Sequence, residues 1–164
     1  MVRMQLLGVR VELPANTPVV MLREVDGDRG RVLPILIGIH EGSAIHTAME
    51  GITPPRPLTH DLLAIMMRTL GATLDKVIIT EVREHTFYAE LHLVTAGGTH
   101  VVSCRPSDAI ALAVRVDAPI FASEALLDEA AVEVPEGNEE GDEEAILDEF
   151  RDFLDDVSPE DFAG

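Results

Sequence analysis

The sequence predicts an α+β fold built from two β-β-β-α units, and three observations lead to this prediction. Alternating apolar residues mark three strands in each half of the chain, and a helical pattern follows each third strand. The two strand-to-helix junctions also align, residues 39–48 (IHEGSAIHTA) with residues 104–113 (CRPSDAIALA), so that Ala-Ile-x-x-Ala is in register. We expect a compact mixed or antiparallel sheet, or a barrel-like core, with helices packed on it.

The first unit is predicted from its apolar periodicity and its turn residues. Its strands are expected at residues 2–13, 17–25 and 31–39, and its helix at residues 41–49. The third strand is apolar enough to be buried on both faces, and Pro34 within it indicates an edge or a bulge.

A further helix is expected between the two units, after a proline-rich loop over residues 51–57. We expect Thr59 to cap a helix over residues 61–70, with Gly71 directly after its end. Apolar side chains recur along it at helical spacing: Leu62, Leu63, Met66, Met67 and Leu70.

The second unit repeats the pattern of the first. Strands are predicted at residues 74–83, 86–95 and 99–104, and Pro106 opens a helix that ends at Val116. A short extended piece at residues 119–121 and a short helix beginning at Ser123 complete this part of the chain.

Charge divides the chain into a nearly neutral body and a strongly acidic end. The whole chain has a net charge of −18, yet residues 124–164 contain 17 acidic residues and one basic residue. We predict a domain over residues 1–130, an acidic linker over 131–144, and an acidic amphipathic helix and tail over 145–164. Such an end repels nucleic acid and anionic membranes and favours a basic protein partner.

Composition excludes several classes of protein. A single cysteine cannot form an intrachain disulfide, and no apolar stretch approaches the ~20 residues that span a bilayer. The N-terminus has no uninterrupted apolar run typical of a secretory signal. We therefore expect a cytoplasmic protein that does not contact a membrane.

Polar residues gather at the predicted starts of three helices, where unpaired backbone N–H groups favour anions such as phosphate. An imidazole there can act as a general acid or base, carboxylates can hold a divalent cation such as Mg²⁺ or Mn²⁺, and arginines can clamp a phosphate. The candidate catalytic residues are Glu41, His60, Asp61 and Asp108. The candidate metal ligands are Glu41, Asp61 and Asp108. The candidate substrate contacts are His40, Arg56, Thr59, Arg105 and Ser107.

Purely structural roles remain open for the same residues. Acids in the first turn of a helix stabilise its dipole, and Thr59 and Ser107 can serve as caps. Arg105 can simply pair with Asp108, and Cys104 in an apolar strand is expected to be buried and unreactive.

Four motifs in a fixed order resemble the bifunctional nuclease domain family. They are Leu33-Pro34-Ile35-x-Ile37-Gly38 with the following Glu41-Gly42-x-Ala44-Ile45, Arg56-Pro57-x-Thr59-His60-Asp61-Leu62, Phe87-Tyr88-Ala89, and Arg105-Pro106-Ser107-Asp108 with the following Ala-Ile-Ala-Leu-Ala. The acidic C-terminal segment is similar to that of members from high-GC Gram-positive (actinobacterial) bacteria.

This resemblance implies a self-associating domain, a dimer or higher, that hydrolyses phosphodiester bonds in DNA, RNA or both, with metal assistance. Two other functions remain open at this point. One is a non-enzymatic regulatory or adaptor protein whose acidic C-terminal helix binds a protein. The other is a domain that binds a small anionic metabolite at the arginine-rich helix starts.

Overall fold

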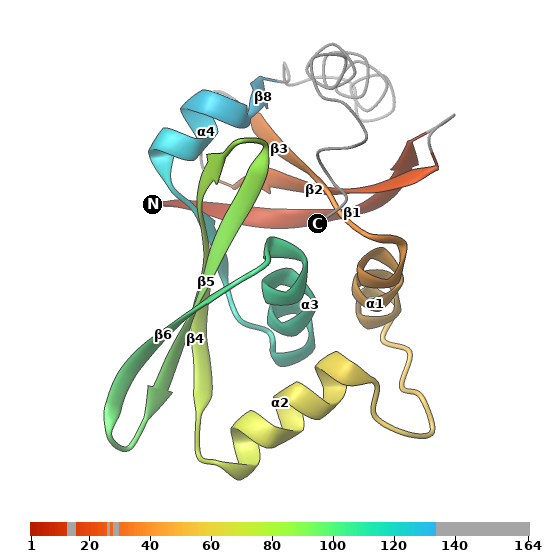
Figure 1. The fold of residues 1–164 in the computed structure, drawn as a ribbon, viewed down its shortest axis with the longest axis vertical. Coiled ribbons are helices and arrows are strands. Elements are labelled where there is room, and N and C mark those ends of the chain that lie inside the picture. The colour runs from red at the N-terminus through yellow and green to blue at the C-terminus, as the bar shows by residue number, and fades with distance from the viewer. Residues whose placement is uncertain (13–15, 26, 28–29, 134–164) are drawn as a thin grey trace.

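A computed structural model describes residues 1–12, 16–25, 27 and 30–133 and shows the two β-β-β-α units (Figure 1). The first unit consists of β1 (Val2–Glu12), β2 (Thr17–Glu24), β3 (Arg31–Leu36) and α1 (Ile39–Met49). Its three strands form an antiparallel meander. The predicted third strand ends at Leu36 rather than at residue 39, because α1 already begins at Ile39.

The second unit follows after α2 (Thr59–Thr69). It consists of β4 (Thr73–Arg83), β5 (Thr86–Thr95), β6 (Gly98–Cys104) and α3 (Pro106–Val116), and its strands again form an antiparallel meander. The aligned Ala-Ile pairs occupy equivalent places in α1 and α3, since Ile45 and Ile110 are both completely buried.

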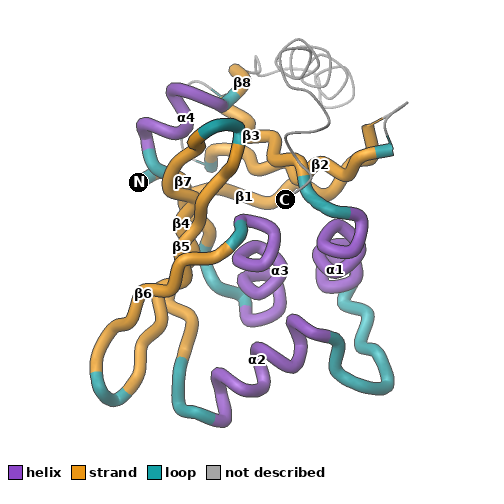
Figure 2. Tube along the Cα trace, viewed as in Figure 1, coloured by secondary structure: helices purple, strands orange, loops and turns teal. Residues whose placement is uncertain are grey.

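A short strand joins the two units into one sheet. β7 (Ile120–Ala122) pairs antiparallel with β1 and parallel with β4, and the strand order is β6-β5-β4-β7-β1-β2-β3-β8. The sheet does not close, so the barrel-like alternative is wrong. Figure 2 shows the two halves of the sheet crossing at a large angle, with α3 in the space between them.

The chain then returns to the other edge of the sheet. α4 (Glu124–Ala130) leads into β8 (Val132–Glu133), which pairs with the start of β3. The helix predicted to begin at Ser123 begins one residue later, at Glu124, and Ser123 is its N-cap, because the Ser123 hydroxyl oxygen accepts from the backbone N–H of Leu126. β8 therefore contains residues that were expected in the acidic linker. The rest of that linker and the predicted helix at 145–164 lie outside the described residues.

The hydrophobic core surrounds α3, on which seven of eleven residues are buried. Core residues of β2, β3, β4 and β5 pack in the same cluster, together with Ile45 of α1 and Met67 of α2. As predicted, β3 is buried on both faces, and Pro34 lies beyond the two residues of β3 that pair with β8. No helix in the described ranges is long and apolar enough to cross a membrane.

Two predicted helix caps are wrong. Leu58 is the N-cap of α2, and Arg105 is the N-cap of α3, so Thr59 and Ser107 each lie one or two residues inside a helix. At α2 the capping interaction is made from the other direction, because Asp61 Oδ2 accepts from the backbone N–H of Leu58 at 2.9 Å. Ser107 follows Pro106 into the helix and is only 6% exposed.

Candidate functional site

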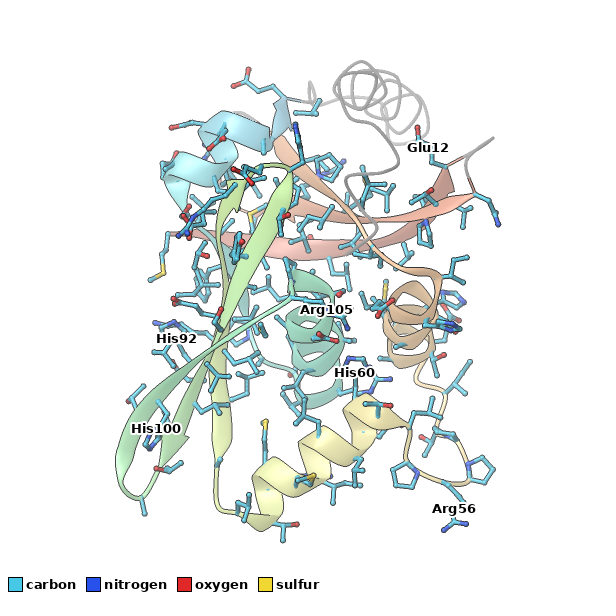
Figure 3. All side chains as sticks on the ribbon, viewed as in Figure 1. Glu12, Arg56, His60, His92, His100 and Arg105 are labelled. Carbon is cyan, nitrogen blue, oxygen red and sulfur yellow. The ribbon has the colours of Figure 1, made fainter. Side chains whose placement is uncertain are left out.

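The starts of three helices meet at one place in the fold, as the sequence predicts. Four of the polar side chains make a continuous chain of contacts there: Glu41 at the start of α1, His60 at the start of α2, and Arg105 and Asp108 at the start of α3. We call these four residues the helix-start cluster. Figure 3 shows Arg105 beside α3 and His60 at the start of α2, whereas Arg56 lies on the loop between α1 and α2.

His60 and Asp108 form the pair at the centre of the helix-start cluster. Their Nε2 and Oδ1 atoms are 3.0 Å apart, and the side chains are 12% and 30% exposed. An ionised carboxylate only accepts hydrogen bonds, so Nε2 carries the proton and its N–H donates a hydrogen bond to Asp108 Oδ1. Nδ1 of neutral His60 therefore presents a lone pair. No completely buried side-chain nitrogen of the described residues lacks a partner, so Nδ1, which makes no such bond, is at least partly accessible to solvent.

Arg105 connects the carboxylates of two helices. Its Nε donates to Asp108 Oδ2 at 2.7 Å, its second terminal nitrogen donates to Oδ1 at 3.1 Å, and its first lies 3.1 Å from Glu41 Oε1. A guanidinium has five N–H groups, so two remain uncommitted on a side chain that is 65% exposed. The structural alternative for Arg105, pairing with Asp108, is therefore confirmed, and it leaves donors for a ligand.

The surroundings of Asp108 keep its carboxyl group ionised. Burial acts to raise its pKa, but the hydrogen bonds from Arg105 and His60 outweigh burial and hold the pKa below its usual value. The same contact with Asp108 raises the pKa of the Arg105 guanidinium, with a smaller contribution from Glu41. The cluster thus maintains a fixed anion behind the imidazole.

Glu41 reaches the cluster because α1 lies close against the first half of the sheet. The next residue, Gly42, is buried, and a Cβ at this position would come within 3.1 Å of the Pro18 side chain and 3.4 Å of Val9. A side chain at this position would require the Pro18 side chain or the start of α1 to shift by a few tenths of an ångström, so the glycine allows α1 to lie this close to β1 and β2. Gly42 was quoted in the sequence motif, but only the structure assigns it this packing role.

Asp61 is directed away from the helix-start cluster. Its Oδ1 accepts from Arg115 Nε at 2.5 Å, and its Oδ2 accepts from the Leu58 backbone N–H. The hydrogen bond from Arg115 holds the pKa of Asp61 below its usual value. Arg115 was not identified from the sequence. Its spacing of seven residues from Asp108 places both on one face of α3, and this periodicity is the signal that could have found it.

The remaining predicted residues do not join the helix-start cluster. His40, Arg56 and Thr59 are exposed, and no ion pair or side-chain hydrogen bond is found for them within the described part of the chain. Ser107 is buried against the core side of α3. Cys104 was expected to be buried, but it is half-buried; burial raises the pKa of its thiol to about 11, which disfavours the reactive thiolate.

The three carboxylates predicted as metal ligands are not gathered in one place. Glu41 and Asp108 share Arg105, while Asp61 binds Arg115. Across residues 1–12, 16–25, 27 and 30–133, no three His, Cys, Asp or Glu side chains come close enough to hold a metal ion. This arrangement does not fit a site in which Glu41, Asp61 and Asp108 bind the same cation.

Sequence comparisons agree with the motifs at this site. The profile of the bifunctional nuclease domain matches residues 20–135, which include every member of the helix-start cluster. An uncharacterized protein of Mycobacterium tuberculosis is 45% identical over 165 residues, covering 96% of both chains.

Plant proteins give more distant matches. Bifunctional nuclease 1 of Oryza sativa subsp. indica is 30% identical over 62% of this chain and 31% of its own length. Bifunctional nuclease 1 of Arabidopsis thaliana is 31% identical over 65% of this chain and 33% of its own length. With a family profile that matches well over half of its residues, this chain belongs to the bifunctional nuclease domain family.

Proposed function

We propose that this protein is a nuclease that hydrolyses phosphodiester bonds in DNA, RNA or both, with the helix-start cluster as its active site. The observation that carries the proposal is the His60–Asp108 pair, in which a carboxylate orients an imidazole whose other nitrogen has no protein partner and is not completely buried. Family membership and the names of the plant relatives support the reaction class.

In this proposal, His60 acts as the general base. Nδ1 takes a proton from water, the water oxygen attacks phosphorus, and the bond from phosphorus to the leaving sugar oxygen breaks. The leaving oxygen takes up a proton from a second water molecule, and the hydroxide so formed is neutralised by the proton that His60 then releases. Asp108 fixes the tautomer of His60 and stabilises the imidazolium that forms. The two free N–H groups of Arg105 donate to the phosphoryl oxygens, on which negative charge accumulates.

The charges of the helix-start cluster favour this proton transfer. Arg105 balances only one of its two carboxylates, so the cluster has a net charge of −1 while His60 is neutral. Proton uptake by His60 brings the net charge to zero. The excess negative charge also opposes the approach of a phosphate, and a requirement for Mg²⁺ or Mn²⁺ therefore stays a prediction, although the carboxylates do not form the ligand set expected from the sequence.

The test is a cleavage assay with matched histidine variants. Purified protein is incubated with single- and double-stranded DNA and RNA, with Mg²⁺, with Mn²⁺ and with a chelator. We expect His60→Gln and Asp108→Asn each to lower kcat by about a hundred-fold or more, since each removes general base catalysis or its orientation. Arg105→Gln is expected to raise KM as well.

His92→Gln is the control. His92 pairs with Glu90 at 3.2 Å on β5, so this substitution removes a histidine–carboxylate pair that lies outside the helix-start cluster. Equal cleavage by wild type and His60→Gln would contradict the proposed active site. A wild-type protein that cleaves none of the four substrates under any cation condition would contradict the activity itself.

We also propose that the protein self-associates through α2. Exposed apolar side chains lie on this helix and at its C-cap, away from the residues that pair with α3: Leu62 at 49%, Leu63 at 37%, Met66 at 51% and the C-cap Leu70 at 77%. A surface helix of this composition is typical of an interface. Because the resemblance implies a self-associating domain, a second copy of this chain is the partner that we propose. The acidic C-terminal segment as a protein-binding element stays a prediction, since its residues lie outside the described ranges.

A further inference from the structure

A cavity of about 380 Å³ lies beside the helix-start cluster, between α2, the end of α3 and the loop that joins α1 to α2. Three charged side chains line it, and they are Asp61, Arg68 and Arg115. Most of the other lining residues are apolar and come from all three of these segments. The cavity has the size of a small-molecule site, and none of its charged residues belongs to the helix-start cluster.

Arg115 is a buried cation with unused donors. Its side chain is only 8% exposed, its Nε donates to Asp61, and its first terminal nitrogen donates to the Ala111 carbonyl oxygen at 2.8 Å. The second terminal nitrogen makes no bond, yet no buried side-chain nitrogen of the described residues lacks a partner. This nitrogen is therefore not completely buried, and Arg115 is one of the residues that line the cavity.

Arg68 supplies a second cation to the same cavity. It is exposed, and within the described part of the chain it makes no ion pair and no side-chain hydrogen bond. Asp61 neutralises one of the two arginines, so the cavity has a net charge of +1. This excess charge and the free N–H groups favour an anionic group, and paired arginines suit phosphate in particular.

The cavity also has apolar lining residues, which suit a flat hydrophobic group. Ile52, Pro54 and Pro57 come from the loop, and Ile65 comes from α2. A nucleotide combines a phosphate with a planar base that packs on such side chains. We propose that this cavity binds one nucleotide unit, with its phosphate between Arg68 and Arg115 and its base against the loop.

The position of the cavity relates it to the helix-start cluster. Asp108 and Arg115 lie seven residues apart on α3, which is about 10 Å along the helix, and His60 and Asp61 are neighbours on α2. The cavity is thus placed to hold a nucleotide near the one whose phosphate is cleaved. The choice of a nucleotide among organic phosphates rests on the proposed nuclease function.

The experiment measures binding of 5′-AMP to the full-length protein by isothermal titration calorimetry, with adenosine and a 5′-phosphorylated pentanucleotide for comparison. We expect Arg68→Gln and Ile52→Asp each to weaken AMP binding by about ten-fold or more, because one removes a charge-assisted hydrogen bond and the other places an anion among the apolar lining residues. Arg115→Lys, which keeps the charge but loses the planar fork, should also weaken binding. Arg3→Gln, an exposed arginine of β1 outside the cavity, should leave it unchanged.

The outcomes separate this inference from the proposed function. His60→Gln should lose cleavage and keep AMP binding. If only the pentanucleotide binds and Arg68→Gln weakens it, the nucleotide is recognised as part of a strand, and the inference stands. Failure of both ligands to bind at about 10 mM, or equal binding by wild type, Arg68→Gln and Ile52→Asp, would overturn it, even if the protein cleaves nucleic acid.

Discussion

Helices α2 and α3 have the same length, and both have an apolar stripe in the sequence, yet they are buried to very different extents. Seven residues of α3 are buried, against only Ala64 and Met67 on α2. α3 packs against α1, α2, β4 and β5, whereas the main neighbour of α2 is α3 itself. An apolar stripe therefore shows that a helix has an apolar face, but the number of surrounding elements decides how much of this face is covered.

The two helices also contribute differently to the proposed functions. α3 supplies fixed anchors, Asp108 and Arg115, on a framework that the core holds in place. α2 supplies His60 and Asp61, each bonded to one of these anchors, and presents its other sides to solvent. A buried helix thus positions the side chains of an exposed one.

The largest expected effect is on the free energy of unfolding, and it compares a buried side chain of α3 with a partly exposed side chain of α2. Ile110→Ala on α3 should lower the free energy of unfolding by about 2–5 kcal/mol, because it opens a cavity around a fully buried side chain. Ile65→Ala on α2, at 38% exposure, should cost less than about 1 kcal/mol. Urea denaturation followed by circular dichroism measures both, and equal losses would contradict the comparison.

The next effect concerns the exposed side of α2. Replacing Leu62 and Met66 together by Glu should convert the proposed oligomer to a monomer, because the two charges cannot be buried in an apolar interface. Light scattering coupled to size-exclusion chromatography gives the mass. Paired replacement of the exposed β1 residues Arg3 and Gln5 by Glu is the control. A wild-type protein that is monomeric, or a variant with unchanged mass, would refute association through α2.

A smaller effect is expected at the ion pair between Asp61 and Arg115. Asp61→Asn leaves a guanidinium that is 8% exposed without its partner, and should cost roughly 1–3 kcal/mol at pH 7. Because folding lowers the pKa of Asp61, its contribution is complete above the unfolded pKa, about 3.9, and is lost as the pH falls through the folded value.

The difference in Tm between wild type and Asp61→Asn should therefore be largest near neutral pH and disappear under strongly acidic conditions. Thermal unfolding from about pH 2 to 7 measures this difference. Asp75→Asn, which removes an exposed carboxylate of β4, controls for the loss of a surface charge. A difference that stays constant over this range would show that the ion pair does not stabilise the fold.

The smallest effect is expected at the start of α2. Thr59→Ala should change the stability by less than about 0.5 kcal/mol, because Thr59 does not cap the helix. Ser123→Ala should cost about 1 kcal/mol, because this hydroxyl caps α4 and also donates to the Thr80 carbonyl oxygen. A larger loss at Thr59 than at Ser123 would contradict the observed cap at Leu58.

The sequence by itself determined the α+β class, the order of the strands and helices from β1 to α4, and the positions of the polar residues at three helix starts, whereas β8 was not predicted. Periodicity, prolines and turn residues act within about ten neighbouring positions, so their effects can be identified without tertiary contacts. Pro106 at the start of α3 and the aligned Ala-Ile pairs of α1 and α3 are examples.

Only the tertiary structure decided which of those residues meet. Glu41, His60 and Asp108 come together because three helices with distant sequence positions pack in one place. Asp61, next to His60, turns toward Arg115 because adjacent side chains on a helix point in different directions. The open sheet and the exposed apolar face of α2 likewise depend on how many elements pack around each segment, and no local pattern contains that information.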